Sequence, residues 1–129
     1  MLKRNKWFVL AGLYTVLVIT VSLVKIKRPV QVNISHADKL VHIGIYFFCT
    51  LIWFIAFRSR GFSKSFPKAL LKASIVAFVL GIILEFAQEF TVTARSGDVK
   101  DVMANGVGII IAALFLYQVK KHLPLNSIK

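Results

Sequence analysis

Acidic residues are scarce in this 129-residue chain, which has five Asp and Glu against 17 Lys and Arg, for a net charge of +12. Cysteine is scarcer still: Cys49 stands alone and excludes an internal disulfide. Internal repeats and low-complexity tracts are lacking as well. Apolar residues, in contrast, make up 57% of the chain, and the mean hydropathy is +0.74. A soluble fold of this size cannot cover so much apolar surface with polar atoms, so the composition predicts a membrane protein.

The excess of positive charge does not indicate a nucleic-acid-binding protein. Basic residues occur in short clusters between apolar runs, and they do not follow one face of a helix. Such flanking clusters are typical of multi-span proteins whose ends contact anionic lipid headgroups. We therefore expect membrane lipids, and no nucleic acid, among the partners.

Four apolar runs approach or reach the ~20 residues that a helix needs to cross a bilayer. They cover residues 7–24, 40–57, 69–90 and 99–119. The first run follows basic residues, as in a signal peptide, but no small-residue cleavage site follows it. A soluble helical bundle is the alternative, but the first two runs lack a polar face wide enough for water. The sequence predicts an all-α fold, a bundle of four transmembrane helices, as a single membrane domain over residues 1–129.

The positive charges are divided unevenly between the two membrane sides. The side with the N-terminus, the second loop and the C-terminal tail carries 11 Lys and Arg, and the other side carries six. Cytoplasmic loops are the ones enriched in Lys and Arg. The sequence therefore predicts a multi-pass protein with both termini in the cytoplasm.

All five carboxylates lie at one end of the predicted bundle. Asp38 opens the second run, Glu85 and Glu89 lie near the end of the third, and Asp98 and Asp101 open the fourth. In an up-and-down bundle these three positions share one membrane face. The charge count predicts that this face is the extracytoplasmic one.

Helical spacing predicts that polar residues form three stripes that face one another near this end. The polar members of these stripes are Asp38 and His42, Glu85 and Gln88, and Asp101 and Asn105. Ionisable side chains that face lipid are energetically unfavourable, so these should point inward and find partners. Lys39 and Arg95 are the expected cations.

Some of these residues also have structural explanations, which stay open. Asp38, and Asp98 with Asp101, are placed where a carboxylate caps a helix or favours its dipole. Gln88 and Asn105 are of a type that often joins membrane helices by hydrogen bonds.

Glu85 has no such explanation. It lies inside the third apolar run, where no helix begins, and His42 or Arg95 must supply its partner. His42 considered alone could be a core histidine that donates to a carboxylate. Glu85 therefore favours a functional role for the whole group of polar residues.

Three ordered motifs run from the second apolar run into the fourth. They are Asp38-Lys39-x-x-His42, Glu85-x-x-Gln88 and Arg95-x-x-Asp98-x-x-Asp101-x-x-x-Asn105-x-x-Gly108. Together they resemble the VanZ-like family of bacterial membrane proteins, although residues 91–94 lack the Gly or Pro found in many members. The resemblance places this chain in the bacterial cell membrane. It also implies that Asp38, His42, Glu85, Gln88, Arg95, Asp101 and Asn105 occupy the family's characteristic polar positions.

The namesake of that family is associated with low-level resistance to the glycopeptide antibiotic teicoplanin, but the resemblance supplies no molecular activity. The first hypothesis is therefore a protein that binds or shields a lipid-linked envelope precursor or an amphiphilic antibiotic. Carboxylates would meet amines or sugar hydroxyls, and cations would meet phosphate or carboxylate. The candidate binding residues are Asp38, Lys39, His42, Glu85, Gln88, Glu89, Arg95, Asp98, Asp101 and Asn105.

Two further hypotheses stay open. An enzyme could use Asp38, His42 and Glu85 in acid–base chemistry, or hold a divalent metal with its carboxylates and imidazole. However, the sequence contains neither a nucleophile motif nor a metal signature, and it identifies no cofactor. A proton- or ion-coupled transporter would use Glu and His as a relay. Because four spans are too few to enclose a path, that function requires a homo-oligomer.

Overall fold

The computed structural model describes residues 2–23, 35–59, 65–91, 99–120 and 122. Within these residues the regular secondary structure consists of α-helices alone. The helices are α1 (Leu2–Leu23), α2 (Ser35–Ser59), α3 (Phe66–Thr91) and α4 (Val99–Val119). Each is long and apolar enough to cross a membrane. The predicted all-α fold with four membrane-spanning helices is thereby confirmed.

Three of the helices begin before their apolar runs because the run marks only the part that matches the hydrocarbon, whereas a helix continues into the headgroup region. At 1.5 Å per residue, the 22 residues of α1 extend about 33 Å, slightly more than the ~30 Å hydrocarbon core. The first turn of α3 contains Pro67, whose missing N–H needs no helical partner there. Ser65 precedes this turn, and its carbonyl accepts a 3.0 Å hydrogen bond from the amide of Ala69.

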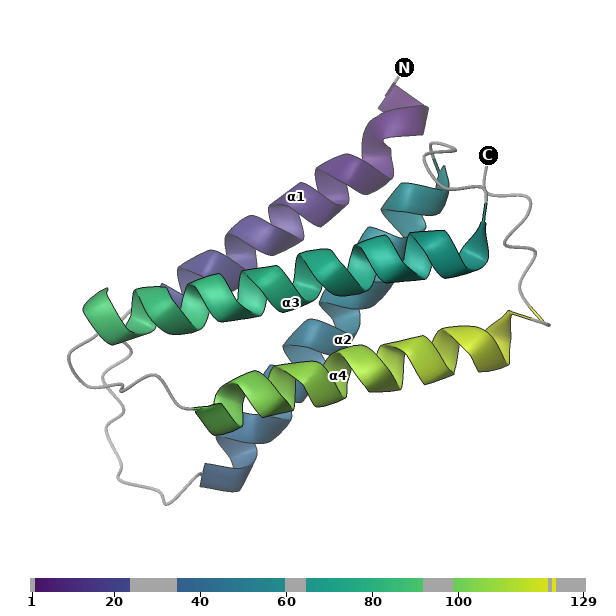
Figure 1. Cartoon of the computed structure of the whole chain (residues 1–129). Helices are drawn as coiled ribbons and strands as arrows, with labels where there is room; N and C mark the ends of the chain where they lie inside the picture. Colours follow the sequence, from purple (N-terminus) through teal and green to yellow (C-terminus); the bar gives the residue numbers. More distant parts are fainter. Residues whose placement is uncertain (1, 24–34, 60–64, 92–98, 121, 123–129) are drawn as a thin grey trace.

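Successive helices alternate in direction, and α2 lies behind α3 and α4 in Figure 1. α2 packs against each of the other three helices, most extensively against α4. α1 is the least buried of the four. The bundle is thus organised around α2, and residues of α2 that face inward meet side chains from α3 and α4.

Gly108 explains how α4 approaches α2 so closely. A β-carbon at this position would collide with the carbonyl oxygen of Ile43 and would lie 3.1 Å from the backbone nitrogen of Phe47. Small residues allow this kind of backbone approach between membrane helices. The contact lies one turn beyond Asn105, so it sets the register of the polar residues on both helices.

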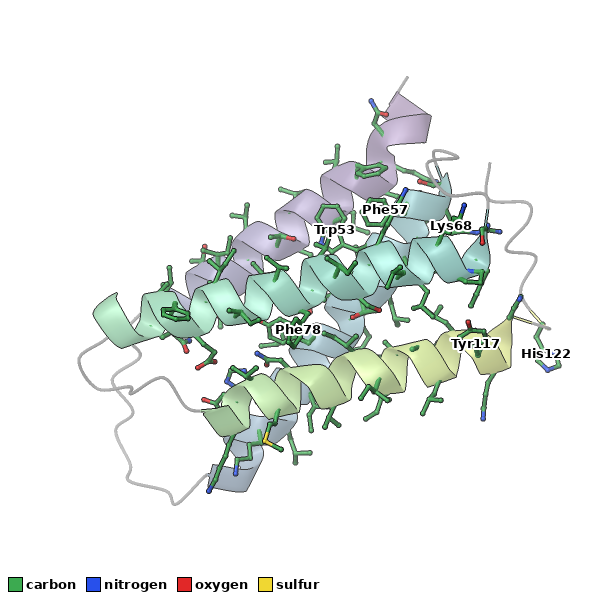
Figure 2. The ribbon with its side chains drawn as sticks, viewed as in Figure 1. Trp53, Phe57, Lys68, Phe78, Tyr117 and His122 are labelled. Atoms are coloured by element: carbon green, nitrogen blue, oxygen red, sulfur yellow. The ribbon has the colours of Figure 1, made fainter. Side chains whose placement is uncertain are left out.

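At the opposite end of the bundle, aromatic rings join α2, α3 and α4. The ring centroids of Phe54 and Phe66 are 5.0 Å apart, and those of Phe66 and Tyr117 are 4.9 Å apart. The ammonium of Lys120 lies 4.7 Å from the centroid of Phe66. Figure 2 shows Tyr117 near the end of α4. The aromatic cluster thus packs this end of the bundle, whereas the buried histidine and carboxylate side chains lie toward the opposite end.

Polar side chains attach α1 to α2. The hydroxyl of Tyr14 donates to the carbonyl of Ile45 at 2.6 Å, and the indole N–H of Trp53 donates to the hydroxyl of Thr15 at 3.1 Å. Phe8 packs edge-on against Trp53, with a centroid distance of 6.2 Å. Because no water competes for these groups in hydrocarbon, hydrogen bonds of this kind hold an otherwise weakly buried helix in place.

Candidate functional site

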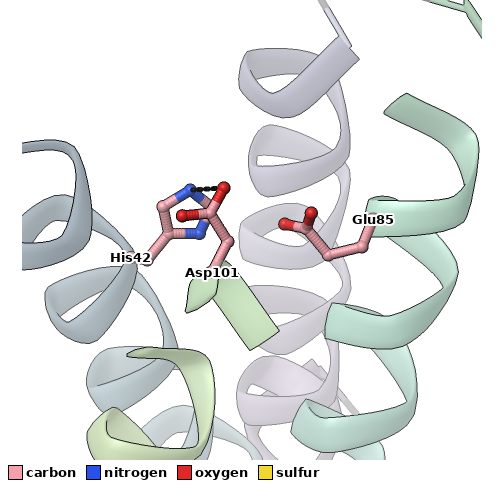
Figure 3. A group of neighbouring side chains, drawn as sticks. All are labelled: His42, Glu85 and Asp101. Atoms are coloured by element: carbon pink, nitrogen blue, oxygen red, sulfur yellow. Dashed lines mark ion pairs between the residues drawn. The ribbon is translucent and has the colours of Figure 1, made fainter. Parts of the chain in front are cut away.

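Three helices each supply one ligating side chain to a single cluster, which we call the triad: His42 from α2, Glu85 from α3 and Asp101 from α4. One ligand atom from each lies within 4.8 Å of the other two. His42 and Glu85 are buried, at 9% and 7% exposure, and Asp101 is partly buried. In Figure 3 the carboxyl of Glu85 points toward His42 and Asp101. The structure therefore brings together a histidine and two carboxylates that are far apart in the sequence.

Asn105 determines how the imidazole of His42 is oriented. Nδ1 of His42 lies 3.0 Å from Oδ1 of Asn105. An amide oxygen only accepts, so Nδ1 carries the proton and donates. Nε2 then faces Oδ2 of Asp101 at 4.0 Å, the ion pair drawn in Figure 3. This contact is an ion pair only when Nε2 of His42 carries a proton.

Gly81 makes room for Asn105. A β-carbon at position 81 would lie 2.9 Å from Nδ2 of Asn105 and 3.3 Å from a ring carbon of Tyr46. Asn105 is only 2% exposed. Its Nδ2 has no hydrogen-bond partner among the described residues. The amide is thus enclosed by α2 and α3, with its oxygen committed to His42.

Asp101 lies in the first turn of α4. The N-terminal end of a helix carries partial positive charge, which favours a carboxylate there. The structural explanation from the sequence therefore holds for Asp101, and its proximity to His42 is an additional property. Asp101 can both favour the dipole of α4 and contact His42 because α4 begins at the triad.

Gln88 is buried but bonds elsewhere. Its Nε2 donates at 2.9 Å to the carbonyl of Ser22, near the end of α1. The last carbonyls of a helix have no partner within it, so Gln88 supplies one. Lys39 lies near the start of α2 and is partly exposed.

The remaining candidates fall outside what the structure describes. Asp38 lies on α2 and Glu89 on α3, but their side chains are not among those described. Arg95 and Asp98 lie outside the described residues altogether, and so does the expected pairing of Arg95 with the carboxylates.

A hollow of about 390 Å³ lies between α3 and α4, and we call it the α3–α4 groove. It is lined by Ser74, Ile75, Phe78 and Val79 on α3 and by Gly106, Ile109 and Ile110 on α4. Figure 2 labels Phe78, at the side of α3 that faces α4. The lining is almost entirely apolar, so hydrocarbon can occupy it.

A family model described as VanZ/LLP1 matches residues 5–120, most of the chain and nearly all of the four helices. The chain belongs to the VanZ/LLP1 family. The resemblance seen in the ordered motifs is thereby confirmed. No significant match to this VanZ/LLP1 protein was found among curated proteins or solved structures.

Sequence reasoning named every member of the triad but missed two of the contacts. It did not pair His42 with Asn105, because the register of α2 against α4 depends on where Gly108 packs. It also missed Ser22 as the partner of Gln88, since a backbone carbonyl leaves no sequence signal. One signal for this packing was present in the sequence: Gly81 lies one turn before Glu85, and a glycine there leaves room for a side chain from another helix, which the structure shows to be Asn105.

Proposed function

We propose that this VanZ/LLP1 protein binds a membrane-embedded amphiphile, with the polar head at the triad and the hydrocarbon chain in the α3–α4 groove. The observation that carries the proposal is that α3 and α4 contribute both to a largely buried polar cluster and to an apolar groove. A lipid-linked envelope component combines the two chemistries in one molecule.

The spacing along the helices supports one continuous ligand. Val79 precedes Glu85 by six residues, about 9 Å of helix, and Gly106 follows Asp101 by five, about 7.5 Å. Ser74 and Glu85 are 11 residues apart, close to three full turns, so they lie on the same side of α3. The hydrocarbon chain would follow this side of α3 from the triad to Ser74 and Phe78 in the groove.

The triad also limits the chemistry of the head. Glu85 and Asp101 present carboxylate oxygens, which accept hydrogen bonds from sugar hydroxyls and amines. The burial of Glu85 and the partial burial of Asp101 strengthen such bonds because water competes poorly there. The groups support a head rich in hydroxyl or amino groups, as in lipid-linked sugars.

The expected orientation of the protein places the site where it could meet envelope precursors. We place the protein in the bacterial cell membrane with both termini in the cytoplasm, on the basis of 11 Lys and Arg on the terminal side against six on the other. The triad then faces the outer leaflet, where envelope precursors are displayed. Binding there would shield such a precursor from teicoplanin, which is how a link to resistance would arise.

The test compares variants that block the groove or neutralise the triad. A β-carbon at Gly106 or at Gly12 meets nothing within 4 Å, so both positions have room for the first carbon of a leucine side chain, but only Gly106 lines the groove. Native mass spectrometry of protein purified from bacterial membranes measures the retained amphiphile. We expect Gly106→Leu and Glu85→Gln to lose most of it and Gly12→Leu to retain it.

Equal retention by all three variants would refute the proposal. Teicoplanin susceptibility of cells that express each variant gives a second measurement. Shielding predicts that the parent and Gly12→Leu lower susceptibility and that Gly106→Leu and Glu85→Gln do not.

One observation favours a second candidate function, acid–base catalysis on the same ligand. Nε2 of His42 lies 4.0 Å from Oδ2 of Asp101, and Asn105 contacts Nδ1. An imidazole and a carboxyl are thus placed together where each could exchange a proton with a bound ligand. Incubation of the purified protein with polyprenyl phosphates and lipid-linked sugars tests it. Catalysis predicts a product that His42→Gln cannot form, whereas unchanged substrate leaves binding as the function.

A further inference from the structure

The triad has the composition and convergence of a metal site. It offers one imidazole nitrogen and two carboxylate oxygens, all within 4.8 Å of one another. Metal–ligand bonds of about 2.0–2.2 Å place neighbouring ligand atoms roughly 3–4 Å apart. Small side-chain rotations therefore suffice to close the three groups around an ion.

The surroundings of His42 fit this reading. Metal-binding histidines commonly donate the second ring N–H to an oxygen, which fixes the tautomer and leaves the other nitrogen for the metal. Oδ1 of Asn105 takes that role at 3.0 Å from Nδ1. Nε2, which lies 4.0 Å from Oδ2 of Asp101, is then the nitrogen that would coordinate the ion in its deprotonated form.

Asn105 supplies a second, independent observation. It is 2% exposed, and its Nδ2 has no hydrogen-bond partner among the described residues. Buried polar groups are nearly always paired, and a bound water or ion is one explanation for an unpaired one. The amide directs its oxygen to His42 even though its nitrogen gains no partner from the described residues.

We propose that His42, Glu85 and Asp101 bind one divalent ion of the first transition series, Zn²⁺ or Mn²⁺. Imidazole suits Zn²⁺, and carboxylates suit Mn²⁺. Mg²⁺ retains several waters and is seldom enclosed by protein ligands, so this mixed set disfavours it. Three protein ligands leave at least one position open, as catalytic and substrate-binding metal sites do.

The ion can reach the site from one end of the bundle. The side chains of His42 and Asp101 are 11% and 17% exposed, so the triad is covered without being sealed. The metal site does not require the amphiphile, and it stands whether or not a lipid binds.

The experiment uses the full chain in detergent with any affinity tag removed. After metals are stripped with a chelator, Zn²⁺ or Mn²⁺ is titrated calorimetrically, and bound metal is counted by mass spectrometry. We expect one ion per chain, with tighter binding of Zn²⁺ or Mn²⁺ than of Mg²⁺. If neither transition ion binds the parent protein with this stoichiometry, the proposal is overturned.

Variants locate the ion. His42→Gln and Glu85→Gln should abolish the titration, and Asn105→Ala should weaken it by about 10–100-fold, as removal of an orienting group does. His122→Gln is the matched control because His122 is exposed and lies at the other end of the bundle. Unchanged binding by His42→Gln would place the ion elsewhere and overturn the proposal. Should that variant fail to fold, Glu85→Gln and Asn105→Ala decide the same question.

Lipid retention by metal-stripped protein keeps the two proposals apart. If the parent protein retains the amphiphile but binds neither Zn²⁺ nor Mn²⁺ on titration, only the metal site is contradicted. Metal binding without any retained amphiphile contradicts the proposed function alone.

Discussion

His42 and Asn105 lie 63 residues apart in the chain, yet Nδ1 of one is 3.0 Å from Oδ1 of the other. The contact joins α2 to α4 at the polar end of the bundle. It also orients the imidazole toward Asp101, on the side where Glu85 converges. The hydrogen bond that joins α2 to α4 therefore also fixes the orientation of the His42 imidazole within the triad.

The close approach of α2 and α4 should depend on Gly108. In Gly108→Ala the new β-carbon meets the backbone of Ile43 and Phe47, which cannot rotate away. We expect a loss of about 1–3 kcal/mol, as for overpacked cores. Thermal or denaturant unfolding in detergent measures it. Gly44→Ala is the control, because its β-carbon meets nothing within 4 Å. Comparable stability of the two variants would contradict the packing described.

Gly81→Ala should impair the site more than the fold. The β-carbon would press on the amide of Asn105 and the ring of Tyr46, both ends of side chains that can shift. A displaced Asn105 no longer orients His42, so we expect metal affinity to fall about tenfold or more. Calorimetric titration measures it, with Gly44→Ala again as the control. Full affinity in a folded Gly81→Ala protein would show that Asn105 does not orient the ring.

Gln88 should contribute to stability without contributing to metal binding. Gln88→Ala removes the donor to the carbonyl of Ser22 and should lower the free energy of unfolding by about 0.5–1.5 kcal/mol. Metal stoichiometry should stay at one ion per chain. The matched control is Gln118→Ala, because Gln118 is exposed on α4. A loss of metal in Gln88→Ala would instead assign Gln88 to the site.

The orientation in the membrane can be tested with single cysteines. Cys49 is buried and can be replaced by alanine, after which Lys100→Cys and Lys120→Cys mark opposite ends of α4. The positive-inside rule predicts that an impermeant maleimide labels only Lys100→Cys in intact cells. Labelling of only Lys120→Cys would show that the topology is the reverse of the one expected and that the triad lies at the cytoplasmic face.

Much of the candidate site could be predicted because carboxylates in an apolar chain are informative. Glu85 lies where no helix begins, so its presence already indicated a buried partner, and His42 is found beside it. Gln88 could not be assigned in the same way. A polar residue on an inward stripe can face either of two neighbouring helices, and only packing directs it to α1.

The sequence alone determined the number of helices and indicated that Glu85 and Asp101 lie at the same end of the bundle. Hydrophobic run length and backbone hydrogen bonding in a bilayer permit few alternatives. Only the tertiary structure decided which polar atoms meet. That outcome depends on ångström-scale register, set here by Gly108 against Ile43 and by Asn105 over Gly81, and side-chain periodicity does not specify register between helices.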